Sequence, residues 1–487
     1  MSQSINRRSF LKSGAIAASG LGLTQQTKAG EAPRLRGKAS LHETARDIPV
    51  VFDSDVVVCG AGPAGVSAAI AAARKGARVL LVESHGQLGG IWTTGLLSWI
   101  IDAGNKDGIM AEIAERIQGR VDVVGGRRWT GKGSMAYDVE QMKLILEQLC
   151  TEAKVQMRLH TRVAGAVVDE VQRITHCVME SKSGREAVAG KVFVDCTGDG
   201  DVAAQAGCGF DWGRPEKGWG SAGTERKGET QPFSLMMLIT GIDPDATAPF
   251  HVREGRSSRQ VKAALLKEFR RAGVEPSYGG PTIFQIHNDL FAWMINHEYG
   301  CSGIDADDLT RATLHAREEL NRLVDALRTL GDPWREIKIV ATAAQIGVRE
   351  GRRIHGRYQV SVEDMLSGVR HDDAVCRVTF GIDVHSTSRN HSTGIEKKPD
   401  KAKFKDYDIP LGALIAKDVD GLMMAGRCIS GDFLSHSSYR VTGNASATGE
   451  GAGVTAALAA KAGTLPHEVP WGEVKNALYS AGTGKKE

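Results

Sequence analysis

The chain has 487 residues, of which 41% are hydrophobic and 24% are charged, and its formal net charge is +3 at pH 7. This length and a near-average composition suit one large unit of two interleaved domains with an ample core. Residues 1–29 hold four basic residues and no acidic one, so the rest of the chain is close to neutral. A role in binding nucleic acid or an anionic membrane surface is therefore not supported.

The first residues predict an export signal. The run SINRRSFLKSG is close to the twin-arginine pattern, and a weakly apolar stretch at 14–23 and a small-residue exit at Thr27-Lys28-Ala29 follow it. We expect residues 1–29 to be a signal peptide recognised by the twin-arginine (Tat) translocon, and the protein to be periplasmic or secreted. The apolar stretch is too short to cross a bilayer, so no membrane span is expected in the mature form. The alternative is a disordered basic N-terminus.

Residues 55–83, DVVVCGAGPAGVSAAIAAARKGARVLLVE, predict a strand, a glycine turn, a helix and a second strand that ends at a carboxylate. Gly60 allows the turn, Gly62 leaves room for a pyrophosphate, and Gly65 lets the helix pack closely on the sheet. The helix amides and dipole then hold the phosphates, and Glu83 accepts ribose hydroxyls. The spacing indicates FAD or NAD; the alternative is an ordinary turn. The candidate contacts are Gly60, Gly62, Ala64, Gly65 and Glu83.

Two later stretches extend this site. The paired glycines of LGG allow backbone amides to approach a second part of the cofactor, although a simple turn is the alternative. Residues 156–191 alternate short polar and apolar runs, which predicts a small antiparallel meander. A strand at 192–196 returns to the sheet and ends in TGDGD, at the edge where open α/β sheets bind ligands. The candidate contacts here are Gly89, Gly90, Gly198 and Asp199.

The middle of the chain predicts a cap. Residues 232–240 are typical of a buried strand, 282–300 of aromatic-rich strands around a turn, and 305–330 of an amphipathic helix. The aromatic residues are expected in the core. Two polar stretches, 211–230 and 386–406, predict long loops, either plain surface excursions or mobile covers over a site.

The last third of the chain favours FAD over NAD. A strand at 421–426 ends in Gly426-Arg427, and Asp432 follows with a carboxylate for the ribityl hydroxyls. The stretch TGNASATGEGAGVTAALAAK then predicts a small-residue helix. Its N-terminus, near Ala445, is placed to direct amides at the pyrimidine edge of a reduced flavin. NAD would need none of these contacts; the alternative for the helix is simple packing of Ala and Gly.

Four blocks together resemble the bacterial FAD-dependent oxidoreductase family, often Tat-exported, of the two-dinucleotide-binding-domain flavoproteins related to fumarate reductase. They are GAGPAGVSAAIAAARKGARVLLVE with LGGIWTTGL, VDCTGDGDVAAQAG, ATAAQIGVREGRRIHG with IDVH, and GLMMAGRCISGD with SHSSYRVTGNASATGEGAGVTAALA. Glu450 stands where this family is expected to have Gln, and Gly443-Asn444 replaces a more usual proline-containing turn. The least matched part, 212–335, is where substrate identity would be encoded.

We therefore expect an α/β fold, with a Rossmann-like FAD-binding domain of parallel sheet and β-meander and an inserted α+β substrate or cap domain. The expected divisions are the signal peptide at 1–29, FAD-binding segments at 50–211 and 341–465, the cap at 212–340 and a C-terminal tail at 466–487.

Hydride transfer needs a group that manages the partner proton and cations that hold a carboxylate or polarise an oxygen. If GVREGRR is helical, its arginines at 349, 352 and 353 share one face, either as a cationic cluster or as a solvated or ion-paired face. The four candidate catalytic residues are Arg349, His385, His436 and Arg440. His436 and Arg440 are expected at the flavin's reactive edge, and the other two in the substrate pocket; each histidine has a structural alternative.

The eight cysteines show no metal-ligand spacing and are expected to be core thiols without a structural disulfide. The favoured function is an exported flavoenzyme that transfers hydride between a small organic substrate and bound FAD, with dioxygen, a quinone or a redox protein as a separate electron acceptor. One alternative is a flavin-bearing electron-transfer or binding protein without its own turnover. Another is a transient-redox lyase or isomerase.

Overall fold

The computed structural model describes residues 40–124, 134–215, 229–250, 258–388 and 404–479. The chain divides into two compact units, Met1–Asp47 and Ile48–Glu487, and all elements below belong to the second. The expected signal peptide and most of the two polar loops lie outside the described residues.

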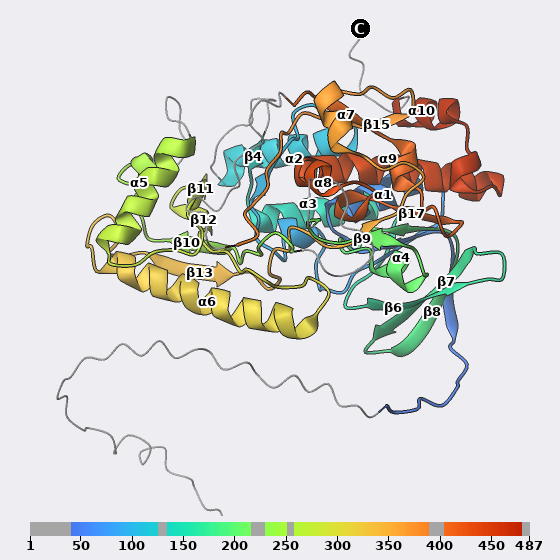
Figure 1. Cartoon of the computed structure of the whole chain (residues 1–487), viewed down its shortest axis with the longest axis horizontal. Coiled ribbons are helices and arrows are strands. Elements are labelled where there is room, and N and C mark those ends of the chain that lie inside the picture. The colour runs from blue at the N-terminus through green and yellow to red at the C-terminus, as the bar shows by residue number, and fades with distance from the viewer. Residues whose placement is uncertain (1–39, 125–133, 216–228, 251–257, 389–403, 480–487) are drawn as a thin grey trace, which may run out of the picture. The chain divides into compact units, whose positions relative to one another are not determined.

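A seven-stranded sheet carries the cofactor-binding part of the chain (Figure 1). Its strands are β1 (Val50–Cys59), β2 (Val79–Val82), β5 (Gln156–Arg158), β6 (Arg162–Val168), β7 (Ile174–Ser181), β8 (Gly184–Asp195) and β17 (Leu422–Met424). The first part, in the order β5-β2-β1-β8-β17, is parallel, and β7 and β6 add antiparallel strands beyond β8. The predicted α/β fold, with a parallel sheet and a β-meander, is confirmed.

Strand β8 corrects one detail of the prediction. We expected the meander to end at 191 and a new strand to run over 192–196, but one strand covers both parts. Its first half pairs with β7 on one side, and its second half lies between β1 and β17 and is buried. The hydrophobic pattern changes because the neighbours of the strand change.

Helices α1 (Pro63–Arg74) and α9 (Thr442–Ala462) pack directly on each other. A Cβ atom on Gly449 would lie 2.1 Å from Ala64 O, and one on Gly453 would lie 2.2 Å from Ala68 O. Glycine is therefore required at both crossings. The small-residue helix predicted after Val441 is confirmed, and its Ala and Gly content also serves packing.

Glu450 of α9 places a carboxylate at the N-terminus of α2 (Ile109–Val124), where its Oε2 accepts a hydrogen bond from Ile109 N at 3.0 Å. Burial raises the pKa of Glu450 to about 7, from an ordinary value of 4.5. The folded state thus binds this proton more tightly than the unfolded state. The contribution of Glu450 to the free energy of unfolding is accordingly full below about pH 4.5 and is lost as the pH rises to about 7.

We expect Glu450→Gln to remove this loss and to raise the free energy of unfolding above pH 7 by on the order of 1–3 kcal/mol. The lower figures allow for the partial exposure of the residue. Urea unfolding of parent and variant at about pH 5 and about pH 8 measures the difference. The same change of stability with pH in both proteins would contradict it.

The cap has its own four-stranded sheet, in the order β11-β12-β10-β13, with two long helices beside it (Figure 1). Its elements are β10 (Met237–Thr240), α5 (Ser258–Arg271), β11 (Thr282–His287), β12 (Leu290–Met294), α6 (Ala306–Arg328) and β13 (Lys338–Thr342). Asp305 caps α6 by accepting hydrogen bonds from Asp307 N and Asp308 N. The hairpin and the amphipathic helix are as predicted, the strand expected over 232–240 is shorter, and β13 passes the expected boundary at 340.

The remaining elements are short or lie around the sheets. They are β3 (Trp99–Ile100), β4 (Met135–Ala136), α3 (Val139–Glu152), α4 (Asp201–Gln205), β9 (Phe210–Asp211), β14 (Arg353–Ile354), α7 (Val362–Ser367), β15 (Ala374–Val378), β16 (Tyr407–Pro410), α8 (Phe433–Tyr439) and α10 (Trp471–Tyr479), with 3₁₀ turns at Gly90–Trp92, Ala248–Phe250, Leu411–Leu414, Gly426–Cys428 and Pro466–Glu468.

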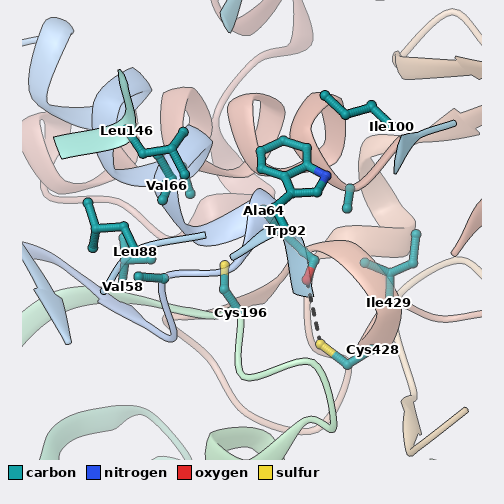
Figure 2. Packing of buried hydrophobic residues seen from close by; sticks show 14 of the residues in the cluster. Val58, Ala64, Val66, Leu88, Trp92, Ile100, Leu146, Cys196, Cys428 and Ile429 are labelled. Carbon is teal, nitrogen blue, oxygen red and sulfur yellow. Dashed lines mark hydrogen bonds between the residues drawn. The ribbon is translucent and has the colours of Figure 1, made fainter. Parts of the chain in front are cut away.

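The core under the glycine turn is formed by side chains from several of these segments. Figure 2 shows Val58 of β1, Val66 of α1 and Leu146 of α3 with Trp92, which is fully buried. All eight cysteines are buried, as expected for core thiols. Within the described ranges, no helix is long and apolar enough to cross a membrane.

Candidate functional site

The glycine turn after β1 contains two glycines that the fold requires and one that it does not. A Cβ atom on Gly60 would lie 2.5 Å from Cys196 O, and one on Gly65 would lie 1.8 Å from Gly60 O. A Cβ atom on Gly62, in contrast, would meet nothing within 4 Å. Gly62 is the N-cap of α1 and has no side-chain cap, so the first amides of the helix face this open space. The arrangement fits a bound pyrophosphate.

Three other segments converge on the start of α1. A Cβ atom on Gly90 would lie 2.9 Å from Gly62 Cα, which places the LGG turn against the glycine turn. A Cβ atom on Gly426 would lie 3.0 Å from Ala64 Cβ and 3.6 Å from Ala445 Cβ. The end of β17 and the first turn of α9 therefore meet α1 at the predicted cofactor position. We call this convergence the cofactor cradle.

The N-terminus of α9 holds buried polar atoms that lack a hydrogen-bond partner within the described residues, namely Thr442 Oγ1 and Asn444 Nδ2. Trp92 Nε1, beside the LGG turn, is also buried and has no hydrogen-bond partner within the described residues. Buried donors and acceptors of this kind are normally satisfied in native proteins. Their place in the cradle fits a polar ring system bound there.

Glu83 follows β2 and is buried. Its Oε2 accepts a hydrogen bond from Ala61 N at 2.7 Å, and its Oε1 accepts one from His85 N at 2.9 Å. Although burial opposes ionisation, His85 and these amides hold the pKa of Glu83 below its ordinary value. The carboxylate is therefore charged beside the glycine turn, and its ribose contact stays a prediction.

Three more predicted cofactor residues contact the protein itself. Arg427 Nη1 donates to Asp199 Oδ1 at 2.8 Å, next to Gly198. Asp432 caps α8 by accepting a hydrogen bond from Ser435 N at 2.7 Å, and its other oxygen accepts one from Val362 N. These contacts give Asp432 a structural role, and a ribityl contact would have to be additional.

A second group of polar residues lies where the cap sequence meets the C-terminal segments, and we call it the polar cluster. Its members come from segments far apart in the chain. One of those from the cap, Lys262, lies on α5. They are Gln231, Lys262, Tyr278, His297, Tyr299, Arg349, Asp383, His385 and Arg440.

The two arginines of the polar cluster are held by neutral acceptors. Arg349 Nη1 donates to Pro232 O at 2.6 Å and to Ser234 Oγ at 3.0 Å. Arg440 Nη2 donates to Asp383 O at 2.9 Å, and its contact with the Asp383 carboxylate is longer, at 3.7 Å. Burial, together with the charge of Arg440, lowers the pKa of Arg349 to about 10. Both side chains nevertheless remain cationic at neutral pH.

Four members of the polar cluster form a hydrogen-bonded chain. Asp383 Oδ2 lies 3.3 Å from His385 Nε2, and His385 Nδ1 lies 3.1 Å from His297 Nε2. His297 Nδ1 lies 3.0 Å from the Tyr299 hydroxyl. Burial lowers the pKa of His385 to about 4, and it also lowers the pKa of His297 well below its ordinary value. Although burial opposes ionisation, His385 and the arginines hold the pKa of Asp383 well below its usual range.

The structure brings three of the four predicted catalytic residues together and leaves one apart. Arg349, His385 and Arg440 are in the polar cluster. His436 Nε2 instead lies 3.1 Å from Arg427 O, and its Nδ1 has no partner within the described residues. Its predicted role at the flavin edge stays a prediction.

The arginines of GVREGRR do not form a cationic cluster, because this segment is not helical. In the extended chain the side chains diverge. Arg352 Nη1 donates to Asp201 Oδ1 at 2.8 Å, and Arg353 forms a buried ion pair with Glu350 at 2.6 Å. Arg349 alone of the three reaches the polar cluster.

Several members of the polar cluster were missed from the sequence: Gln231, Lys262, Tyr278, His297, Tyr299 and Asp383. His297 and Tyr299 alternate in NHEYG, which places both on one side of an extended segment. The aromatic residues around them favour a place in the core instead. Asp383 stands two residues before His385 in IDVH, so in an extended segment these two side chains also lie on one side. In the described part of the chain, no group of three or more His, Cys, Asp or Glu residues could hold a metal ion.

A family model described as FAD dependent oxidoreductase matches residues 55–478. A segment of 43 residues is 58% identical to thiamine thiazole synthase of Aeropyrum pernix. That segment is 9% of this chain and 16% of the relative, so the match spans about a sixth of the relative's length.

Solved structures with a similar course of the chain are of low identity. A geranylgeranyl bacteriochlorophyll reductase-like protein of Thermoplasma acidophilum is 13% identical, with a TM-score of 0.44, over 88% of this chain and 82% of that chain. The flavin-dependent brominase Bmp2 is 12% identical, with a TM-score of 0.47, over 87% and 83%. The anhydrotetracycline hydroxylase OxyS of Streptomyces rimosus is 12% identical, with a TM-score of 0.44, over 88% and 65%.

Proposed function

The chain belongs to the FAD-dependent oxidoreductase family, and we propose that it transfers hydride between a small organic substrate and bound FAD, with the polar cluster as the substrate site. One observation carries this proposal. Gln231 Nε2 and Arg440 Nε are buried donors without a partner within the described residues, and Arg440 stands two residues before α9. A ligand that accepts hydrogen bonds there would satisfy both donors beside the cofactor cradle.

The cofactor, when bound, supplies a two-electron acceptor or donor. The amides at the start of α1 and α9, with Gly62 and Gly90, would hold it by its phosphates and its ring. The residues of the polar cluster would orient the substrate and manage its proton. Arg349 and Arg440 supply cationic donors, and the Asp383 chain supplies a path for the proton.

The direction of the hydrogen bonds in this chain follows from the charges. Because Asp383 is ionised and both histidines are neutral, His385 must donate from Nε2 to Asp383 and accept at Nδ1. His297 must then donate from Nε2 and accept at Nδ1 from the Tyr299 hydroxyl. Each link therefore points toward Asp383, and a proton that the substrate gives to Tyr299 would replace the one that Tyr299 passes on, with one hop at each link toward Asp383.

Anaerobic reduction of the bound flavin tests the proposal. The holoprotein is first photoreduced to record its reduced spectrum, and the oxidised form is then mixed with candidate substrates. We expect at least one small organic substrate to bleach the flavin band, or to reoxidise the reduced form. Photoreduction without a response to any substrate would favour the alternative, an electron-transfer protein without its own turnover.

We also propose that the protein is related to fumarate reductase, as its sequence motifs suggest. We propose further that it is exported by the twin-arginine route. Support for export comes from the RRSFLK motif and from the cofactor, because this route carries folded proteins that have already bound it. Replacing Arg7 and Arg8 by Lys is expected to leave the precursor in the cytoplasm. Fractionation and immunoblotting measure this, and an unchanged periplasmic yield would refute it.

A further inference from the structure

The polar cluster has more positive than negative charge. Lys262, Arg349 and Arg440 are its cations, and Asp383 is its one carboxylate. The nearby Glu350 does not change this balance, because it forms a buried ion pair with Arg353 at 2.6 Å. Within the described residues, neither Lys262 nor Arg349 forms an ion pair with a carboxylate.

Lys262 has an unusual position for a lysine. It extends from α5 into the cluster, where its Nζ lies 3.4 Å from the Tyr278 hydroxyl. It also lies 5.7 Å from the centroid of the Tyr278 ring, and that ring packs at 4.2 Å on His297. Burial lowers the pKa of Lys262; the charge of Asp383 opposes this shift, and the charge of Arg349 adds to it. Three cations that share one carboxylate in a largely buried cluster are costly without a further anion.

We propose that the substrate is a small organic anion, with a carboxylate group that Lys262 and Arg349 bind and a reacting carbon that faces the cofactor cradle. The inference rests on the proposed function, in which this cluster receives the substrate. An anion would balance the charge of the two cations. It would also accept hydrogen bonds from the unpaired Gln231 Nε2 and Arg440 Nε, which are both donors.

The test is a calorimetric titration of the holoprotein with glycolate and malonate, each compared with its neutral amide. In the parent, we expect each acid to bind at least ~10-fold more tightly than its amide. Lys262→Met should weaken binding of the acids by ~10–100-fold, and Arg349→Met should do the same. Lys262 makes one long polar contact, so its variant remains informative if loss of the Arg349 contacts disturbs folding.

Lys267→Met is the matched control, because Lys267 lies on the exposed side of the same helix. It should bind the acids as the parent does. Equal binding of acids and amides, parental binding in both cluster variants, or no binding of either acid up to about 10 mM would overturn the inference. The titration involves no turnover. If the protein binds these acids but no substrate reduces its flavin, the proposed function is refuted and the anion site is still supported.

Discussion

Gly62→Val is expected to abolish FAD binding and to leave the fold intact. Gly62 has φ −67° and ψ −173°, an extended conformation that valine adopts readily, and a Cβ atom there meets no protein atom within 4 Å. The added side chain would instead occupy the space of the pyrophosphate. We expect affinity for FAD to fall by ~10²-fold or more, measured by fluorescence titration of the apoprotein.

Two further glycines separate loss of the cofactor from loss of the fold. Gly65→Ala should destabilise the protein itself, because its Cβ would lie 1.8 Å from Gly60 O. Gly472→Val, in α10, should change neither property, since nothing lies within 4 Å of a Cβ there. The melting temperature of Gly62→Val should match that of the parent stripped of FAD. Parental FAD content in Gly62→Val would show that the cofactor lies elsewhere.

His385→Gln is expected to slow substrate-driven reduction of the flavin by ~10²–10⁴-fold. Glutamine can donate to Asp383 and accept from His297, as His385 does, but it cannot pass a proton between them. The bound flavin spectrum and the melting temperature should stay near those of the parent. Anaerobic stopped-flow mixing measures the rate once a substrate is known.

His176→Gln, on β7 of the meander, is the control for a histidine outside the cluster. Its bound flavin should be reduced by the substrate at the parental rate. His436→Gln distinguishes the two candidate positions for the proton. If it slows reduction and His385→Gln does not, the proton is handled in α8 and the hydrogen-bonded chain to Tyr299 is structural.

The cofactor cradle was predictable because its parts are local in sequence. The spacing of Gly60, Gly62 and Gly65 specifies a turn between a strand and a helix, and short-range sterics then decide the geometry. The meander was harder to divide, since β8 has β7 on one side in its first half and β17 in its second, while β1 stays on the other side. Sequence alone shows the change in pattern but does not show which strand lies alongside.

The polar cluster was only partly predictable because it is built from long-range contacts. His436 and Arg440 were expected at the flavin edge and Arg349 and His385 in the substrate pocket, whereas the contacts group Arg440 with Arg349 and His385. Lys262 and His297 come from the cap, where no motif marks them. On a helix the arginines of GVREGRR would share one face, but the Arg353–Glu350 ion pair and the short strand β14 hold that segment extended.

Identification of the cofactor released from the purified protein tests the central claim most directly. The protein is denatured without protease, and the released compound is identified by chromatography and mass spectrometry. The cradle of Gly62, Gly90 and the α9 N-terminus predicts FAD, held noncovalently at about one molecule per chain. A colourless protein, or NAD in the extract, would contradict the account.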